Sequence, residues 1–166
     1  MRFDLTQRFN AAPDDVAAAF CDPGFYEALA ATPGMGDPKL VGREGDGDQV
    51  HLKVRYRFTG ELSAAARAVL DPAKLVWVED SHHDLAARAV TFRMLPDHYA
   101  DRFRASGRYW FEAAGQGSGV TLRRAEGDLK VKAPLVGGAV ERAIVSGLRG
   151  RMDDEVAVLE RYLAGS

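Results

Sequence analysis

The chain has 166 residues, 46% of them hydrophobic and 28% charged, with a net charge of −2 at pH 7. This length can bury the core of one domain spanning residues 1–166, and this composition excludes a disordered chain. The slightly negative charge argues against a protein that binds nucleic acid, which usually carries a large positive excess. No apolar run is long enough to cross a bilayer, and the N-terminus lacks the apolar stretch of a signal peptide. We therefore expect a cytoplasmic protein with no integral membrane association, and the single cysteine, Cys21, agrees with a reducing compartment.

The N-terminal part of the chain predicts a strand followed by two short helices. Residues 2–10 alternate, with Phe3, Leu5 and Phe9 on one face, which is typical of a half-buried strand. Pro13 can occupy the first turn of a helix that the sequence Asp22-Pro23-Gly24 ends. A second short helix is expected over residues 25–31, before a Thr-Pro-Gly sequence.

Six further strands follow in long meanders, which favours an antiparallel sheet of seven strands. We expect them over residues 39–44, 50–58, 75–81, 88–95, 102–113 and 120–131. The turn between the first two contains two glycines at 45–48, and the turn after residue 81 falls on His82-His83-Asp84. Gly127 lies inside the last strand, where it predicts a β-bulge.

A long helix from Pro134 to about Leu163 completes an α+β fold in which one helix packs on one sheet. Hydrophobic residues form one stripe along it: Val136, Val140, Ile144, Leu148, Met152, Val156, Leu159 and Leu163. The charged residues are expected largely away from this stripe: Glu141, Arg142, Arg149, Asp153, Asp154, Glu160 and Arg161. Small residues flank the stripe at Ala139, Ala143, Gly147 and Gly150.

The order of these elements resembles the helix-grip fold of the START-like and polyketide cyclase-like superfamily. The opening Phe3-x-x-x-x-x-Phe9-x-Ala-x-Pro13-x-x-Val16 is typical of it. The segment Gly127-Asp-Leu-Lys-Val-Lys-Ala-Pro-Leu-Val-Gly-Gly-Ala-Val-Glu141 is similar to a bacterial START-like family of unknown function. The resemblance implies a cavity between the long helix and the concave face of the sheet, which in the superfamily usually accepts hydrophobic molecules such as lipids, sterols or polyketides.

The residues that we expect to line this cavity are large side chains of the inner sheet face, residues that close one end, and the middle of the helix. They are Tyr26, Met35, Tyr56, Trp77, Phe92, Tyr109, Ala143, Ile144, Gly147 and Leu148. Trp77 is expected to face inward because aromatic residues tend to be buried, although Val76 and Val78 support the opposite face. The alternative is that all these residues pack as an ordinary core and that the small residues bring the helix close to the sheet.

No motif predicts a cofactor, a catalytic nucleophile or a metal site. His82 and His83 are adjacent on a strand and therefore point in opposite directions, and no third ligand has a diagnostic spacing. The inner faces are expected to be almost free of Asp, Glu and His, apart from Glu79 or Arg88. On the outer face, a basic stripe of His51, Lys53, Arg55 and Arg57 and a second of Arg102, Arg104 and Arg108 are interpreted as solvated, with acidic partners such as Glu126 and Asp128.

Three functions remain open. The first is a carrier or sensor, monomeric or homodimeric, that binds a hydrophobic small molecule. The second is an enzyme of cyclase or hydratase type, which would need an acid or base inside the cavity. The third is an interaction domain without a ligand.

Overall fold

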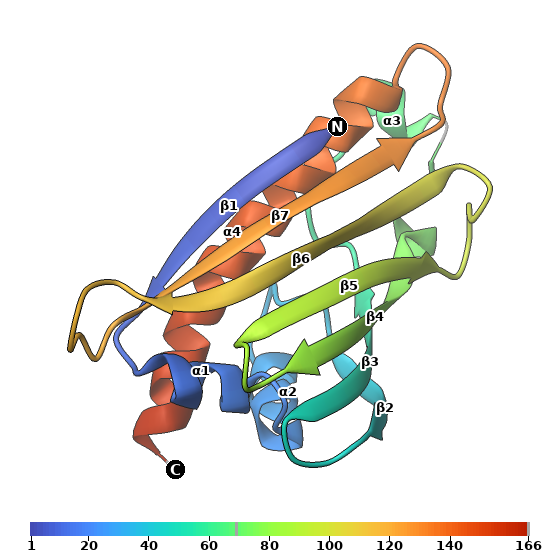
Figure 1. Ribbon diagram of the computed structural model, residues 1–166. Helices are drawn as coiled ribbons and strands as arrows, with labels where there is room; N and C mark the ends of the chain where they lie inside the picture. Colours follow the sequence, from blue (N-terminus) through green and yellow to red (C-terminus); the bar gives the residue numbers. More distant parts are fainter. Residues whose placement is uncertain (69, 166) are drawn as a thin grey trace.

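The computed structural model describes residues 1–68 and 70–165 and has one curved antiparallel sheet wrapped around a long helix (Figure 1). The sheet has seven strands in the order β1-β7-β6-β5-β4-β3-β2. The strands are β1 (Arg2–Phe9), β2 (Lys39–Glu44), β3 (Gln49–Arg57), β4 (Val76–Asp84), β5 (Ala89–Pro96), β6 (Phe103–Ala113) and β7 (Thr121–Val131). The helices are α1 (Pro13–Ala19), α2 (Pro23–Ala30), α3 (Ala64–Arg67) and α4 (Gly137–Ala164), with a 3-10 turn at Pro72–Lys74. The predicted order of elements is confirmed.

Alternation along the strands decides which side of the sheet meets the helix. In β1 and β3 every second residue is buried, as period-two burial against one core requires. The first strand pairs with the last, Phe3 opposite Gly127, so β1 and β7 lie side by side at one edge of the sheet. The concave face therefore carries the inward side chains of all seven strands, with α4 lying across it (Figure 1).

The short helices α1 and α2 close one end of this arrangement, beside the C-terminal part of α4 (Figure 1). Pro13 and Pro23 occupy the first turn of each, where a missing N–H costs nothing, and the Asp22 carboxylate caps α2 by accepting from the Gly24 N–H at 2.9 Å. Phe20 and Phe25 point into the core from this end.

The long helix begins at Gly137, three residues later than the sequence predicts. Leu135 has a φ of 66° and is fully exposed, so the segment after Pro134 turns before the helix starts. Gly137 is required there because a Cβ would lie 2.6 Å from the Val131 carbonyl oxygen. Val140 and Leu159 are fully buried against the sheet, each contributing about 1.5–3 kcal/mol to the free energy of unfolding.

Three local expectations are wrong. His82, His83 and Asp84 belong to β4, and the turn follows them. Gly127 is paired without a shift of register on both sides, so it forms no bulge; a Cβ there would lie 2.6 Å from the Phe3 ring and from the Ser106 carbonyl oxygen. Glu141 is buried rather than solvated, and its Oε1 accepts a hydrogen bond from the Val131 N–H at 2.9 Å.

Candidate ligand-binding site

An apolar cavity lies between the middle of α4 and the concave face of the sheet, and we call it the outer cavity. Its free volume is about 60 Å³, counted as the space open to the centre of a water-sized sphere. One water molecule needs roughly 10–15 Å³ on that measure, so the space admits several. Apolar residues from five sheet strands and α4 form most of the wall, among them Phe3, Val76, Trp77, Met94, Phe103, Ala105, Leu129, Val131, Ile144, Val145 and Leu148. The lining also includes three exposed residues, Lys74, His98 and Arg102, so the cavity reaches the surface there.

A second, inner cavity of about 40 Å³ adjoins the first. Phe3, Met94, Leu148 and Arg151 line both, and the inner cavity continues toward α1 and α2. Its remaining wall is aromatic and charged: Phe20, Tyr26, Tyr56, Glu79, Phe92, Tyr109, Arg123, Ala125, Met152 and Glu155. The interior therefore changes from apolar near the surface to polar at depth.

Arg123 and Glu155 form a closed ion pair at the far side of the inner cavity. Arg123 NH1 lies 2.6 Å from Glu155 Oε2, and both side chains are at most 4% exposed. The other two nitrogens of Arg123 donate to Gln7 Oε1 at 3.2 Å and to the Met152 carbonyl at 3.5 Å. The guanidinium also lies 5.0 Å from the ring centroid of Phe20. All nitrogens of this arginine are thus occupied within the fold.

Arg151 has fewer partners than its five N–H donors can serve. It stacks over the Tyr56 ring at 4.5 Å from the centroid and forms a side-chain hydrogen bond with Tyr56, and its NH1 lies 3.8 Å from Glu155 Oε1. That carboxylate is already held more closely by Arg123. Arg151 is the charged residue that faces both cavities, so its guanidinium stands where the apolar and polar halves of the interior meet.

Glu79 projects from β4 into the inner cavity. Among the described residues, none forms a hydrogen bond or a close ion pair with its carboxyl group. Burial raises the pKa of Glu79, and nearby Glu155 adds to this rise, while Arg151 and Arg123 oppose it. The Tyr109 hydroxyl likewise has no hydrogen-bond partner in the described part of the chain, whereas the Tyr26 hydroxyl donates to the Phe20 carbonyl at 2.8 Å. The Glu79 carboxyl group and the Tyr109 hydroxyl therefore keep unused hydrogen-bonding capacity inside the inner cavity.

Eight of the ten residues expected to contact a ligand line one or both cavities. Trp77, Ile144 and Gly147 line the outer cavity, and Leu148 lines both. Tyr26, Tyr56, Phe92 and Tyr109 line the inner cavity. Met35 is buried in the main core and Ala143 packs in a smaller cluster with Val140, so neither lines these two cavities.

Glu79 is turned inward, as the expectation for the inner faces allowed. The expectation is wrong for His83, which is buried on the same strand, and it did not foresee Glu155, Arg123 and Arg151 in the interior. Alternation could have found Arg123, because it shares a strand face with Thr121 and Ala125. Arg88, by contrast, lies at the surface with a φ of 53° and forms an ion pair with Asp14.

His83 and Cys21 are buried groups outside the cavity linings. Burial lowers the pKa of His83 to about 4, and His82 adds to this effect, so the ring is neutral at pH 7. Its Nε2 lies 3.0 Å from Ser81 Oγ, and its Nδ1 is buried without a partner among the described residues. Burial raises the pKa of the Cys21 thiol to about 11, which makes it a poor nucleophile.

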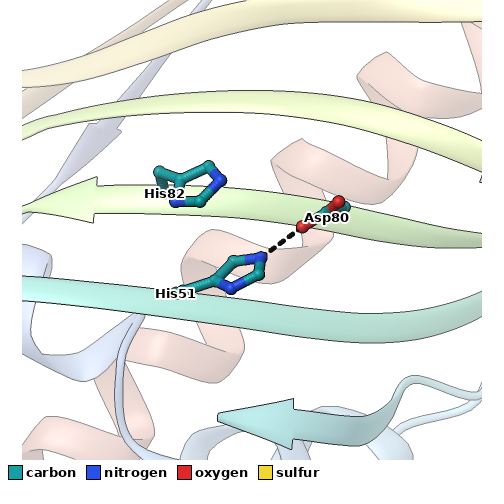
Figure 2. A group of neighbouring side chains, drawn as sticks. All are labelled: His51, Asp80 and His82. Atoms are coloured by element: carbon teal, nitrogen blue, oxygen red, sulfur yellow. Dashed lines mark hydrogen bonds and ion pairs between the residues drawn. The ribbon is translucent and has the colours of Figure 1, made fainter. Parts of the chain in front are cut away.

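On the outer face of the sheet, His51, Asp80 and His82 gather on β3 and β4, as Figure 2 shows. One potential metal-ligating atom from each lies within 4.8 Å of the others. However, Asp80 already accepts from His51 at one oxygen and from Arg93 at the other, with Arg93 NH2 at 2.7 Å. The two imidazole rings stack at 4.2 Å and 8°, so their nitrogens do not converge on one point. A cation would have to displace Arg93 and rotate a ring, and we interpret the group as a network that neutralises the buried Asp80.

The basic stripe on the outer face is largely paired with acids, as expected. Arg57 NH2 lies 2.7 Å from Asp37, and Arg55 pairs with Asp97. Across the next strands, Arg108 Nε lies 2.6 Å from Glu126 Oε1. These contacts are exposed and contribute little to stability.

The architecture is the helix-grip fold. The structure superposes on the Zhui aromatase/cyclase of a Streptomyces species with a TM-score of 0.66 and 14% identity, covering 98% of this chain and 95% of that one. For norcoclaurine synthase from Thalictrum flavum the TM-score is 0.64 at 18% identity, with 100% and 87% covered. For TTHA0849 from Thermus thermophilus the values are 0.65 and 18%, with 100% and 99% covered.

The chain belongs to the family described as "Protein of unknown function (DUF2505)", which matches residues 4–163. Among curated proteins, none matches this chain significantly. No helix in the described residues has the combination of length and apolar character needed to span a membrane.

Proposed function

We propose that this protein binds a hydrophobic small molecule between α4 and the sheet. The observation that carries the proposal is the apolar outer cavity of about 60 Å³ that reaches the surface. Water in such a space finds few hydrogen-bond partners, so an apolar guest displaces it favourably. Two proteins with the same fold, an aromatase/cyclase and norcoclaurine synthase, are named as enzymes, which supports a small-molecule site in this fold.

The test introduces side chains of increasing size at Gly147, which lines the outer cavity. A Cβ there would meet Phe58 at 3.4 Å and Gly60 at 3.5 Å, which is ordinary contact, so Gly147→Ala should fold as stably as the wild type or better. The longer side chain of Gly147→Leu must enter the outer cavity. We expect it to weaken binding of the neutral fluorescent probe N-phenyl-1-naphthylamine about tenfold, equivalent to about 1.4 kcal/mol.

Melting curves and probe titrations of the wild type and the two variants distinguish a ligand site from a filled core. Probe binding that is saturable in the wild type and in Gly147→Ala but weakened in Gly147→Leu supports a ligand site. A wild type without saturable binding, together with a Gly147→Leu protein destabilised by about 1–3 kcal/mol, would mean that the helix rests on a filled core. The carrier interpretation would then be wrong, and an interaction domain would be the better interpretation.

A second candidate, an enzyme that uses acid–base chemistry, is favoured by Glu79. This carboxyl group lines the inner cavity, and burial raises its pKa, as suits a proton donor or acceptor. Such an enzyme would accelerate exchange of the α-protons of a bound ketone with solvent. Proton NMR in D₂O should show that acceleration for the wild type and its loss in Glu79→Gln; equal rates for the two proteins would exclude this role of Glu79.

A further inference from the structure

The charged side chains around the outer cavity are all basic. Arg57, Lys74, Arg102 and Arg151 line it, and no Asp or Glu appears in its lining, although the whole chain has a net charge of −2. Arg57 and Arg102 have acidic neighbours outside the lining, Asp37 at 2.7 Å and Asp101 at 3.7 Å. With these two arginines paired, Lys74 is the entrance residue with no acid at ion-pair distance among the described residues, and its charge favours a negatively charged molecule.

The deep end of the same space holds two arginines and two acids. Arg123 and Glu155 neutralise each other at 2.6 Å, which leaves Arg151 and Glu79. Burial raises the pKa of Glu79, which favours the protonated and neutral form. The charge of Arg151, whose nearest acid is Glu155 at 3.8 Å, is therefore only partly compensated in this cavity.

We propose that the ligand is an amphipathic acid whose carboxylate binds Arg151 while its apolar body fills the outer cavity. This inference rests on the proposed function and adds the chemical class of the ligand. A guanidinium can hold a carboxylate with two parallel N–H···O bonds, and Arg151 has N–H donors that its partners within the protein do not use. The hydroxyl of Tyr109 and a protonated Glu79 supply further donors in the adjoining inner cavity, so the head group would be surrounded by hydrogen-bond donors.

The basic residues at the entrance offer a second place for an acidic head group, and the experiment distinguishes the two places. Decanoate and 1-decanol have the same number of carbon atoms, so the ratio of their affinities reports mainly recognition of the head group. Each is titrated against the complex with N-phenyl-1-naphthylamine at pH 7.5, with wild type, Arg151→Met, Arg151→Lys and the entrance variant Lys74→Met. Thermal melts confirm that each variant is folded.

We expect the wild type to prefer decanoate over decanol by tenfold or more, about 1.4 kcal/mol. Arg151→Met should reduce the preference to less than twofold while still binding the neutral probe, and Arg151→Lys should keep part of it. Lys74→Met should change the preference by less than threefold. Loss of the preference in Lys74→Met with retention in Arg151→Met would place the head group at the entrance and overturn the proposal.

Two other results are equally clear. A wild type that binds the neutral probe but does not prefer the acid refutes the assignment of the head group and leaves the proposed function standing. A wild type that binds neither the probe nor decanoate refutes both. If Arg151→Met does not fold, the ratio measured for Arg151→Lys decides: an undiminished preference with no dependence on salt would contradict an ionic contact at this position.

Discussion

Removing the charge of Glu155 should destabilise the protein strongly. The Arg123–Glu155 pair is nearly inaccessible to solvent, and Glu155 is the acid in closest contact with Arg123, at 2.6 Å. Glu155→Gln keeps the shape of the side chain but leaves a buried guanidinium with only neutral acceptors on Gln7 and Met152. Breaking a buried pair in this way costs about 3–5 kcal/mol. For a chain of this length, a melting temperature lower by about 6–20 °C follows.

A matched control is present on the outer face. Arg108 and Glu126 lie at the same 2.6 Å, but their side chains are 64% and 42% exposed. Glu126→Gln should therefore change the free energy of unfolding by less than about 1 kcal/mol. Urea denaturation at pH 7, analysed with a common m-value, measures both variants. If Glu155→Gln differs from the wild type as little as Glu126→Gln does, the pair is hydrated and our description of the interior is wrong.

Two further predictions concern single positions in the sheet. Because the folded pKa of Glu79 is raised, its contribution to stability is fully present below the ordinary value of 4.5 and is lost as the pH rises through the raised pKa. Glu79→Gln should thus melt higher than the wild type at pH 7 and equally at pH 4; a lower melting temperature at pH 7 would show an ionised, paired Glu79. Gly127→Ala should cost about 1–3 kcal/mol in urea denaturation, because its Cβ would lie 2.6 Å from the Phe3 ring and from the Ser106 carbonyl; an unchanged midpoint would contradict this close packing.

The fold could be predicted because its strands each bury one face. Alternation in β1 and β3 identifies the buried side directly, and the stripe from Val140 to Leu159 identifies the helix face. The ends of elements were less predictable. The late start of α4 depends on the positive φ of Leu135, which no residue preference suggests. Similarly, the polar residues from His82 to Asp84 resemble a turn, yet pairing with β3 and β5 holds them in the sheet.

The apolar half of the site could be predicted, whereas of the charged half only Glu79 was anticipated and Arg123 could have been found from strand alternation. Trp77, Tyr56 and Tyr109 were found because large aromatic residues at inward positions are usually buried. Arg123, Arg151 and Glu155 were missed because charged residues are almost never fully buried unless they are paired. Their pairing joins β7 to α4 across the interior, and this contact depends on the tertiary structure.

The charged residues of the interior fall into two groups with different roles. Arg123 and Glu155 are bonded within the fold, whereas Arg151 and Glu79 keep unused hydrogen-bonding capacity. A fold that only needed Arg123 and Glu155 to pair across the interior would give every guanidinium nitrogen a partner, as it does for Arg123. Arg151 has only the Tyr56 side chain and a 3.8 Å contact with Glu155, and no described residue bonds the Glu79 carboxyl group, although leaving a polar group unsatisfied inside a protein costs about 1–3 kcal/mol. Close packing could have removed that cost by placing apolar residues there, since such replacements are often neutral or stabilising. Their presence beside a cavity is therefore best explained by a ligand that supplies the missing partners. The preference of the wild type for decanoate over decanol tests this explanation directly.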